Sequence, residues 1–220
     1  MRAAARIDIV ITTPPLLAEP FARTTLDFLR ASVSPAVANH SIRAYFYAEH
    51  LADRWNARQH EEYDPRALFF AAILHDLGLG DAGARRPDRF EVAGADLATE
   101  HLRDHGVDAA TADRVWEAIA LHTSTGIAER RGLLCRLVAA GTALDFGVDP
   151  DPGAEHVTDE VAADLHARHP RLNTSSALHA AIVGQARAVP TKAPVGSVAR
   201  YLVKTDDLGA PSDIPMRWGD

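Results

Sequence analysis

The segment ALFFAAILHDLGLG, at residues 67–80, is apolar around nearly its whole circumference and yet contains the adjacent polar residues His75 and Asp76. Asp64 and Pro65 precede it, and an aspartate followed by proline is a typical helix start. A helix that is apolar on all sides is normally buried in the core of a protein. The segment therefore predicts a central helix with both polar residues in its last turn and a glycine-rich end.

Two further helices are predicted to turn polar residues toward the same core. In residues 35–54 apolar residues recur every three or four positions, and His40 lies on their face. In residues 131–146 the same spacing aligns the apolar face with Asp145. Taken singly, each of these residues has an ordinary structural explanation, the histidines as hydrogen-bonded core residues and the aspartates as carboxylates at helix ends. Buried together they need a shared partner, and a metal ion accounts for the whole set. The predicted ligands are His40, His75, Asp76 and Asp145.

The ligand types narrow the choice of metal. Imidazole and carboxylate together suit Zn, Fe or Mn, whereas the mixture is too rich in nitrogen for Ca or Mg. His75 and Asp76 are adjacent, and neighbouring residues at a helix end point roughly 100 degrees apart, so both can reach one ion. We expect one divalent metal ion as cofactor, with Zn as the first choice and Fe or Mn as alternatives.

The rest of the chain is also predicted to be helical. An aromatic content of 6% with abundant Ala and Leu favours helix-on-helix packing, because strand cores use more β-branched and aromatic residues. The expected fold is an all-α helical bundle. We predict an irregular N-terminal segment at residues 1–20, one domain at 21–190, and an irregular tail at 191–220 that packs on the domain or on a partner subunit. The expected helices span approximately residues 21–32, 35–54, 65–76, 91–105, 109–122, 131–146, 158–169 and 174–188.

The charge balance limits the classes of partner. A formal net charge of -7 argues against a broad phosphate-binding face, although small anionic substrates stay open. Arg85, Arg86 and Arg89 form a local basic cluster after the metal-site segment, for which a solvated loop is the default interpretation. No nucleic acid partner is therefore expected.

Cysteine content and hydropathy bear on the compartment. Cys135 is the only cysteine, which excludes an internal disulfide framework and a Cys-rich zinc site and suits a reducing compartment. The apolar run at residues 7–11 is short and carries Asp8, which makes it a poor secretion signal. No other stretch approaches the roughly 18 apolar residues of a membrane span. We expect a cytoplasmic protein without a membrane partner.

The order of the predicted ligands resembles a known signature. His40, then the doublet His75-Asp76 in an apolar helix that ends in glycine, and then Asp145 are similar to the His, His-Asp and Asp motif of the HD-domain superfamily of metal-dependent hydrolases. The resemblance covers about residues 20–190 and implies an HD-type helical bundle with a zinc-type site. Four words look like those of the cyanamide hydratase-like branch: NHSIRAYFYA (39–48), LFFAAILHDLGL (68–79), RFEVAGADLA (89–98) and AIALHTS (118–124).

The number of metal ions follows from a comparison with dinuclear members of that superfamily, which carry extra histidines between the doublet and the last aspartate. Where such members place a histidine just before Gly94, this chain reads FEVAG, with Glu91 nearby. His101 is a poor substitute, because it lies off the apolar face that contains Leu102. We therefore favour one metal ion, and a two-metal site is the alternative.

The resemblance also implies roles for the carboxylates around the ion. A metal-bound water would be the nucleophile, since a bound cation lowers the pKa of water toward neutrality. Asp76 or Asp145 would accept its proton. Glu91 is a candidate base, or only an acidic residue in the first turn of a helix.

Three more residues are candidates for contact with a substrate. His122 faces inward and is a candidate acid or hydrogen-bond donor, with a buried structural histidine as the alternative. Thr123 follows it and is a candidate substrate-binding residue. Arg43, one turn after His40, could hold a substrate or the carboxylate of a metal ligand, although a surface salt bridge is the simpler interpretation.

Three functions are compatible with these patterns. The leading hypothesis is a mononuclear metal-dependent hydratase or hydrolase acting on a small nitrile- or amide-like molecule, as the resemblance to cyanamide hydratase implies. The alternative is an HD-type phosphohydrolase acting on a nucleotide or another phosphate ester, which the arginine cluster favours. A third is a regulatory domain that keeps the ligands for stability. A small-molecule partner is expected, and formation of a homo-oligomer is left open.

Overall fold

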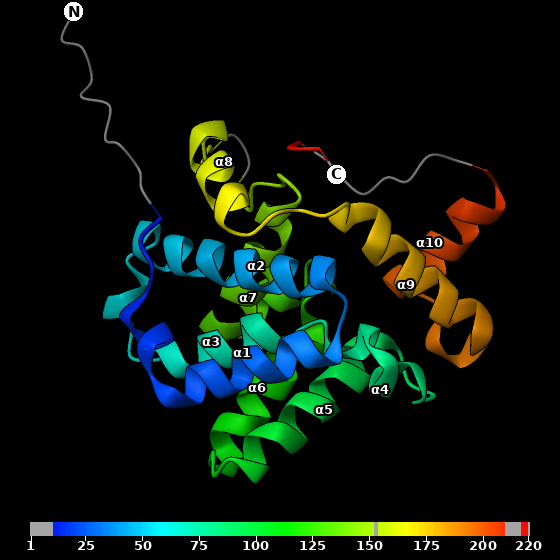
Figure 1. Cartoon of the computed structure of the whole chain (residues 1–220), viewed down its shortest axis with the longest axis horizontal. Helices are drawn as coiled ribbons and strands as arrows, with labels where there is room; N and C mark the ends of the chain where they lie inside the picture. The colour runs from blue at the N-terminus through cyan, green and yellow to red at the C-terminus, as the bar shows by residue number, and fades with distance from the viewer. Residues whose placement is uncertain (1–10, 152–153, 210–216, 220) are drawn as a thin grey trace, which may run out of the picture.

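The computed structural model describes residues 11–151, 154–209 and 217–219, which form helices and no strand (Figure 1). The expected all-α fold is confirmed. The α-helices are α1 (Pro20–Ser32), α2 (Pro35–Arg54), α3 (Pro65–Leu74), α4 (Asp81–Ala84), α5 (Phe90–Asp104), α6 (Ala109–Leu121), α7 (Leu133–Asp145), α8 (Asp159–Arg168), α9 (Thr174–Ala188) and α10 (Val198–Asp207). Short 3-10 turns are η1 (Pro15–Ala18), η2 (Ala57–Gln59), η3 (Leu77–Leu79), η4 (Ala128–Arg130) and η5 (Pro190–Lys192).

Helix α3 is the centre of the bundle, where it packs against α1, α2, α5, α6 and α7. The carboxylate of Asp64 caps it by accepting hydrogen bonds of 3.0 Å from the backbone N–H groups two and three residues later. All residues from 67 to 74 are buried, as the apolar pattern predicts. The helix ends at Leu74, so His75 and Asp76 lie in the turn that follows and not within its last turn.

A glycine allows the closest helix pair to form. Helices α2 and α7 make the most extensive contact in the bundle, and Gly141 of α7 faces the backbone of α2. A Cβ atom at Gly141 would lie only 2.5 Å from the carbonyl oxygen of Ala44. This close approach brings Asp145, one turn later on α7, within hydrogen-bond distance of His40 and Arg43 on α2.

The prediction of an irregular tail at residues 191–220 is wrong for Val198–Asp207, which form the helix α10. Ser197 caps this helix by accepting a hydrogen bond of 3.1 Å from the backbone N–H of Arg200. The helix escaped prediction because Pro194 and Gly196 interrupt the pattern before it and its apolar stripe is short. Helices α9 and α10 form a hairpin at one side of the bundle (Figure 1). Buried residues of the hairpin form a second, small core together with Phe90 of α5. The residues are Phe90, Ile182, Val183, Ala186, Ala193, Ala199 and Leu202.

The predicted domain limits can be compared with the structure only where the two chain ends are described. Within the predicted irregular segment 1–20, the structure places η1 and starts α1 at Pro20, while residues 1–10 lie outside the described residues. In the tail, α10 packs on α9, and residues 210–216 and 220 lie outside the described residues. Packing of the tail on a partner subunit stays a prediction.

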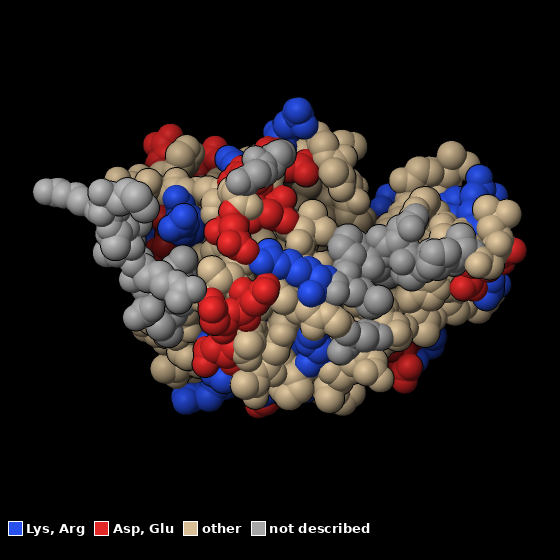
Figure 2. Space-filling model, turned by 90° about the horizontal axis from the view of Figure 1, so that it is seen from above, with Lys and Arg blue, Asp and Glu red and all other residues tan. Residues whose placement is uncertain are grey.

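The described surface carries both signs of charge. Figure 2 shows one face, on which Asp and Glu are intermingled with Lys and Arg, without a continuous basic patch. The expected absence of a nucleic acid partner stays a prediction. Among the described helices, none combines the length and the apolar character that a membrane crossing requires.

Candidate metal centre

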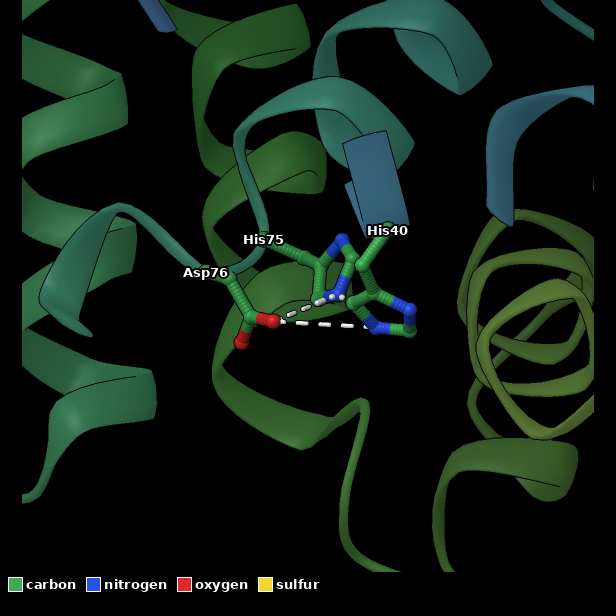
Figure 3. A group of neighbouring side chains, drawn as sticks. All are labelled: His40, His75 and Asp76. Carbon is green, nitrogen blue, oxygen red and sulfur yellow. Dashed lines mark hydrogen bonds and ion pairs between the residues drawn. The ribbon is translucent and has the colours of Figure 1, made fainter. Parts of the chain in front are cut away.

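Three predicted ligands meet in the interior of the bundle. His40 comes from α2, and His75 and Asp76 come from the turn after α3. The two Nε2 atoms of the histidines are 3.2 Å apart, and Asp76 Oδ2 lies 3.6 Å from Nε2 of His40 and 3.2 Å from Nε2 of His75. All three side chains are buried and point toward one another (Figure 3). In the described part of the chain, this is the group whose donor atoms are spaced to hold a metal ion.

The hydrogen bonds made by Nδ1 of the two histidines leave the Nε2 lone pair of each ring directed at the place where the three side chains meet. Nδ1 of His75 lies 2.8 Å from the carbonyl oxygen of Ala72, which can only accept, so the ring donates there. Nδ1 of His40 lies 2.7 Å from Asp145 Oδ2 and donates to that carboxylate. In the neutral rings both Nε2 atoms are therefore acceptors, and they face each other beside the Asp76 carboxylate. Such convergence of acceptors is stable only around a cation, so these residues fit a divalent metal ion.

The ionisation of the centre also favours a cation. Burial opposes the charge on Asp76, but the His75 and His40 rings offset burial and hold the pKa of the carboxyl below its usual range. Burial lowers the pKa of His40. Burial also works to lower the pKa of His75, but Asp76 more than offsets it and raises that pKa. The ionised carboxylate therefore attracts one positive charge, which a proton on His75 or a divalent cation supplies.

Asp145 lies on the other edge of the His40 ring and outside the group of three. Its two carboxylate oxygens accept hydrogen bonds from Arg43 Nε and Nη2 at 2.7 Å each. Burial works to raise the pKa of Asp145, but the hydrogen bonds from Arg43 and His40 hold it below its usual range. In this geometry Asp145 fixes the orientation and tautomer of His40. Direct ligation of a metal by Asp145 stays a prediction.

Arg43 holds the carboxylate of Asp145, one of the roles predicted for it, and it is neither a surface residue nor part of the cavity. Its side chain is fully buried. Besides its bonds to Asp145, Nη1 donates to the carbonyl oxygens of His169 and Pro170 at 3.0 and 3.2 Å, and Nη2 donates to Thr174 Oγ1 at 3.0 Å. All five N–H groups of the guanidinium are thus engaged inside the fold, and none is available to a substrate.

His122 stands beside the group of three at the end of α6. Its Nδ1 donates to the carbonyl oxygen of Ile119 at 2.7 Å, and its Nε2 lies 3.7 Å from Asp76 Oδ1. Burial, followed by the charge of nearby His75, lowers the pKa of His122 to about 4. At neutral pH the ring is uncharged and its Nε2 is an acceptor. The geometry therefore favours a proton acceptor over the predicted acid or donor.

Glu91 lies next to His122 and is fully buried. Its Oε1 accepts hydrogen bonds from Arg89 Nη2 at 2.5 Å and Thr123 Oγ1 at 2.6 Å, and its Oε2 accepts one from Arg89 Nε at 3.0 Å. Burial works to raise the pKa of Glu91, but the hydrogen bond from Arg89 lowers it. The carboxylate is engaged by these partners, which suits an anchor for Thr123 better than a base. His101 lies elsewhere, stacked on Phe28 with ring centroids 4.1 Å apart.

A cavity of about 830 Å³ opens from the metal centre. His40, Asp76, His122 and Thr123 line its polar end. Sequence reasoning missed the other walls, which include Ala139 and Ala143 of α7, Phe146 just after it, Leu178 and Ile182 of α9, and Leu202 of α10. The only sequence signal for these residues was their inward-facing helical spacing, which is the same for a core position as for a cavity wall.

The comparisons with known proteins agree with this geometry. The family model described as HD domain matches residues 37–167, more than half of the 220 residues. The matched range contains all four predicted ligands, His40, His75, Asp76 and Asp145. A search among curated proteins found no match. On the family match and the buried His-His-Asp centre, the chain belongs to the HD domain family, whose members are generally metal-dependent hydrolases.

Proposed function

We propose that this HD domain protein is a metal-dependent hydratase or hydrolase that adds water to an uncharged electrophilic carbon, as in a nitrile or an amide. The observation that carries the proposal is that the arginines in and around the described cavity already have partners within the protein. Of the two that line it, Arg130 donates to the carbonyl oxygen of Gly126 at 2.6 Å and Arg136 lies 3.8 Å from Asp151. The two neighbouring arginines, Arg43 and Arg89, bind the internal carboxylates of Asp145 and Glu91.

The same observation weakens the alternative of a phosphohydrolase. Enzymes that transfer or cleave phosphate groups usually place Arg or Lys on the phosphate oxygens. The predicted basic cluster does not reach the cavity, because Arg86 bonds to Glu100 at 2.8 Å and Arg89 bonds to Glu91. Arg85 does not line the cavity either. An uncharged substrate is the better match to these walls.

The chain's own residues supply the remaining parts of the reaction. When bound, a divalent cation contributes Lewis-acid polarisation of water and of the electrophilic group. Nε2 of His122 is positioned to accept a proton, because its Nδ1 is held by the Ile119 carbonyl. Thr123, held by Glu91, presents a polar side chain at the same end. Phe90 packs on the His122 ring, at 5.8 Å between centroids, and helps exclude bulk water.

Zinc is the cation we propose. Two imidazole nitrogens and one carboxylate oxygen match its usual catalytic ligand set of three protein groups with an open position. Iron and manganese accept the same donor types and are the alternatives.

Metal analysis and two assays test the proposal. Elemental analysis is expected to find about one equivalent of metal in the wild type and almost none in His75→Ala, because this change removes a buried ligand. His60→Ala is the matched control, since His60 is exposed. Loaded enzyme is then assayed for ammonia or hydration product from a panel of amides and nitriles, and for phosphate from a nucleotide panel. Metal-free wild type, or release of phosphate alone, would contradict the proposal.

A further inference from the structure

The cavity is much larger than a nitrile or amide group requires. Its volume of about 830 Å³ lies in the range of pockets that bind drug-sized ligands, roughly 300–1,000 Å³. A molecule of a few atoms would leave most of this space filled with water. The size therefore raises the question of what else the substrate carries.

The residues along and just after helix α7 that line the cavity show how far the cavity extends. At its inner end, the ring of Phe146 packs on His40 with centroids 5.0 Å apart. At its outer end, Arg136 lines the cavity and stacks over Trp55, with its guanidinium carbon 4.0 Å from the ring centroid. These two residues are separated by about 15 Å along the helix, at about 1.5 Å per residue. The polar end and the rim are thus far apart.

The walls between these ends are mostly apolar. Ala139 and Ala143 of α7 line one side, and Ile182 of α9 and Leu202 of α10 line the cavity from the hairpin. Besides Asp76, the charged side chains that line the cavity are those of Glu129, Arg130, Arg136 and Asp149, and Arg136 lies 3.8 Å from Asp151. A cavity that is polar beside the metal centre and mostly apolar along α7 suits a ligand of the same polarity.

We propose that the substrate is an uncharged amide or nitrile whose functional group is joined to a long apolar group, an alkyl chain or an aryl system. The functional group lies against His40, Asp76 and His122. The apolar group extends along α7, past Ala139, toward Arg136. This inference rests on the proposed function for the identity of the polar group, and on the cavity alone for the apolar group.

A chain-length series tests the inference on the wild type. Straight-chain primary amides from acetamide to octanamide are titrated into metal-loaded protein by calorimetry, and KM is measured in parallel. Each added methylene is expected to strengthen binding by about fourfold, the factor that corresponds to burial of one methylene. Affinity that is equal for acetamide and octanamide would overturn the inference without any variant.

A substitution in the wall adds a second test. Ala139 lies about 10 Å along α7 from Phe146, so the side chain of Ala139→Phe would obstruct the middle of the cavity. The preference for octanamide over acetamide is expected to fall at least tenfold. Ala163→Phe is the matched control, because Ala163 is exposed on α8, and should keep the wild-type preference. Circular dichroism establishes that both variants are folded.

The outcomes separate the two claims. An unchanged preference in Ala139→Phe would overturn the assignment of this wall to the substrate. Chain-length-dependent binding without turnover of any amide or nitrile would overturn the proposed reaction and support the apolar pocket. Turnover of acetamide and octanamide with equal KM would support the reaction and overturn the pocket.

Discussion

Replacement of Arg43 by methionine is expected to reduce the free energy of unfolding by about 3–5 kcal/mol, the usual cost of removing one partner from a buried ion pair. The side chains of Arg43 and Asp145 are both fully buried. Methionine fills similar space but returns none of the hydrogen bonds. The loss is large compared with the 5–15 kcal/mol that typically stabilise a domain.

The contacts that remain show why the cost is not larger. After the change, Asp145 keeps its hydrogen bond from His40 at 2.7 Å and an ion pair with Arg171 at 3.6 Å. The carbonyl oxygens of His169 and Pro170, which now accept from Arg43, lose that donor. A lysine at position 43 would keep the charge but not the two parallel bonds to Asp145, so Arg43→Lys should cost less than Arg43→Met.

Urea unfolding followed by tryptophan fluorescence and circular dichroism measures these differences. The matched control is Arg103→Met, because Arg103 and Asp113 form an exposed ion pair at 3.4 Å that should contribute no more than about 1 kcal/mol. The variants should share the wild-type dependence on urea, which shows that the folded and unfolded states are comparable. Loss of stability in Arg43→Met no greater than in Arg103→Met would refute the reasoning.

Two further predictions concern packing and pH. Gly141→Ala should lower the stability by about 1–3 kcal/mol, because its Cβ would press on the Ala44 carbonyl; calorimetric melting checks this, and an unchanged melting temperature would contradict it. Burial is the main reason that the pKa of His122 falls to about 4 in the folded metal-free protein. In the unfolded chain the same side chain takes up a proton near pH 6.5. Stability should therefore fall as the pH drops from about 6.5 to 4, by about 3 kcal/mol more in the wild type than in His122→Phe, and parallel pH profiles from urea unfolding would disprove this.

Where helical periodicity decides the outcome, the sequence predicted most of the helices and the burial of His40, His75 and Asp76 correctly. His40 lies on the apolar face of its helix, and the doublet His75-Asp76 follows the most apolar segment, so burial of all three could be inferred without coordinates. The confirmed all-α fold has the same origin. A buried polar residue is costly unless it has a partner, which makes such positions informative.

The partners of those residues could not be predicted in the same way. Spacing places Arg43 one turn from His40, but its bond to Asp145 depends on how closely α7 approaches α2 at Gly141. Such an approach is a property of the packed pair of helices and not of either helix alone. The cavity was beyond prediction for the same reason, because residues from α7, α9 and the unexpected α10 form its walls together.

The separate small core of the α9–α10 hairpin has a consequence for how this protein can diversify. One side of the apolar part of the cavity belongs to the hairpin, whereas His40, His75 and Asp76 are anchored in the main bundle. Substitutions at distant sites without shared neighbours act almost independently. Mutations at Ile182 or Leu202 can therefore change substrate choice while leaving the metal ligands in place, which makes the hairpin the natural starting point for a directed-evolution library.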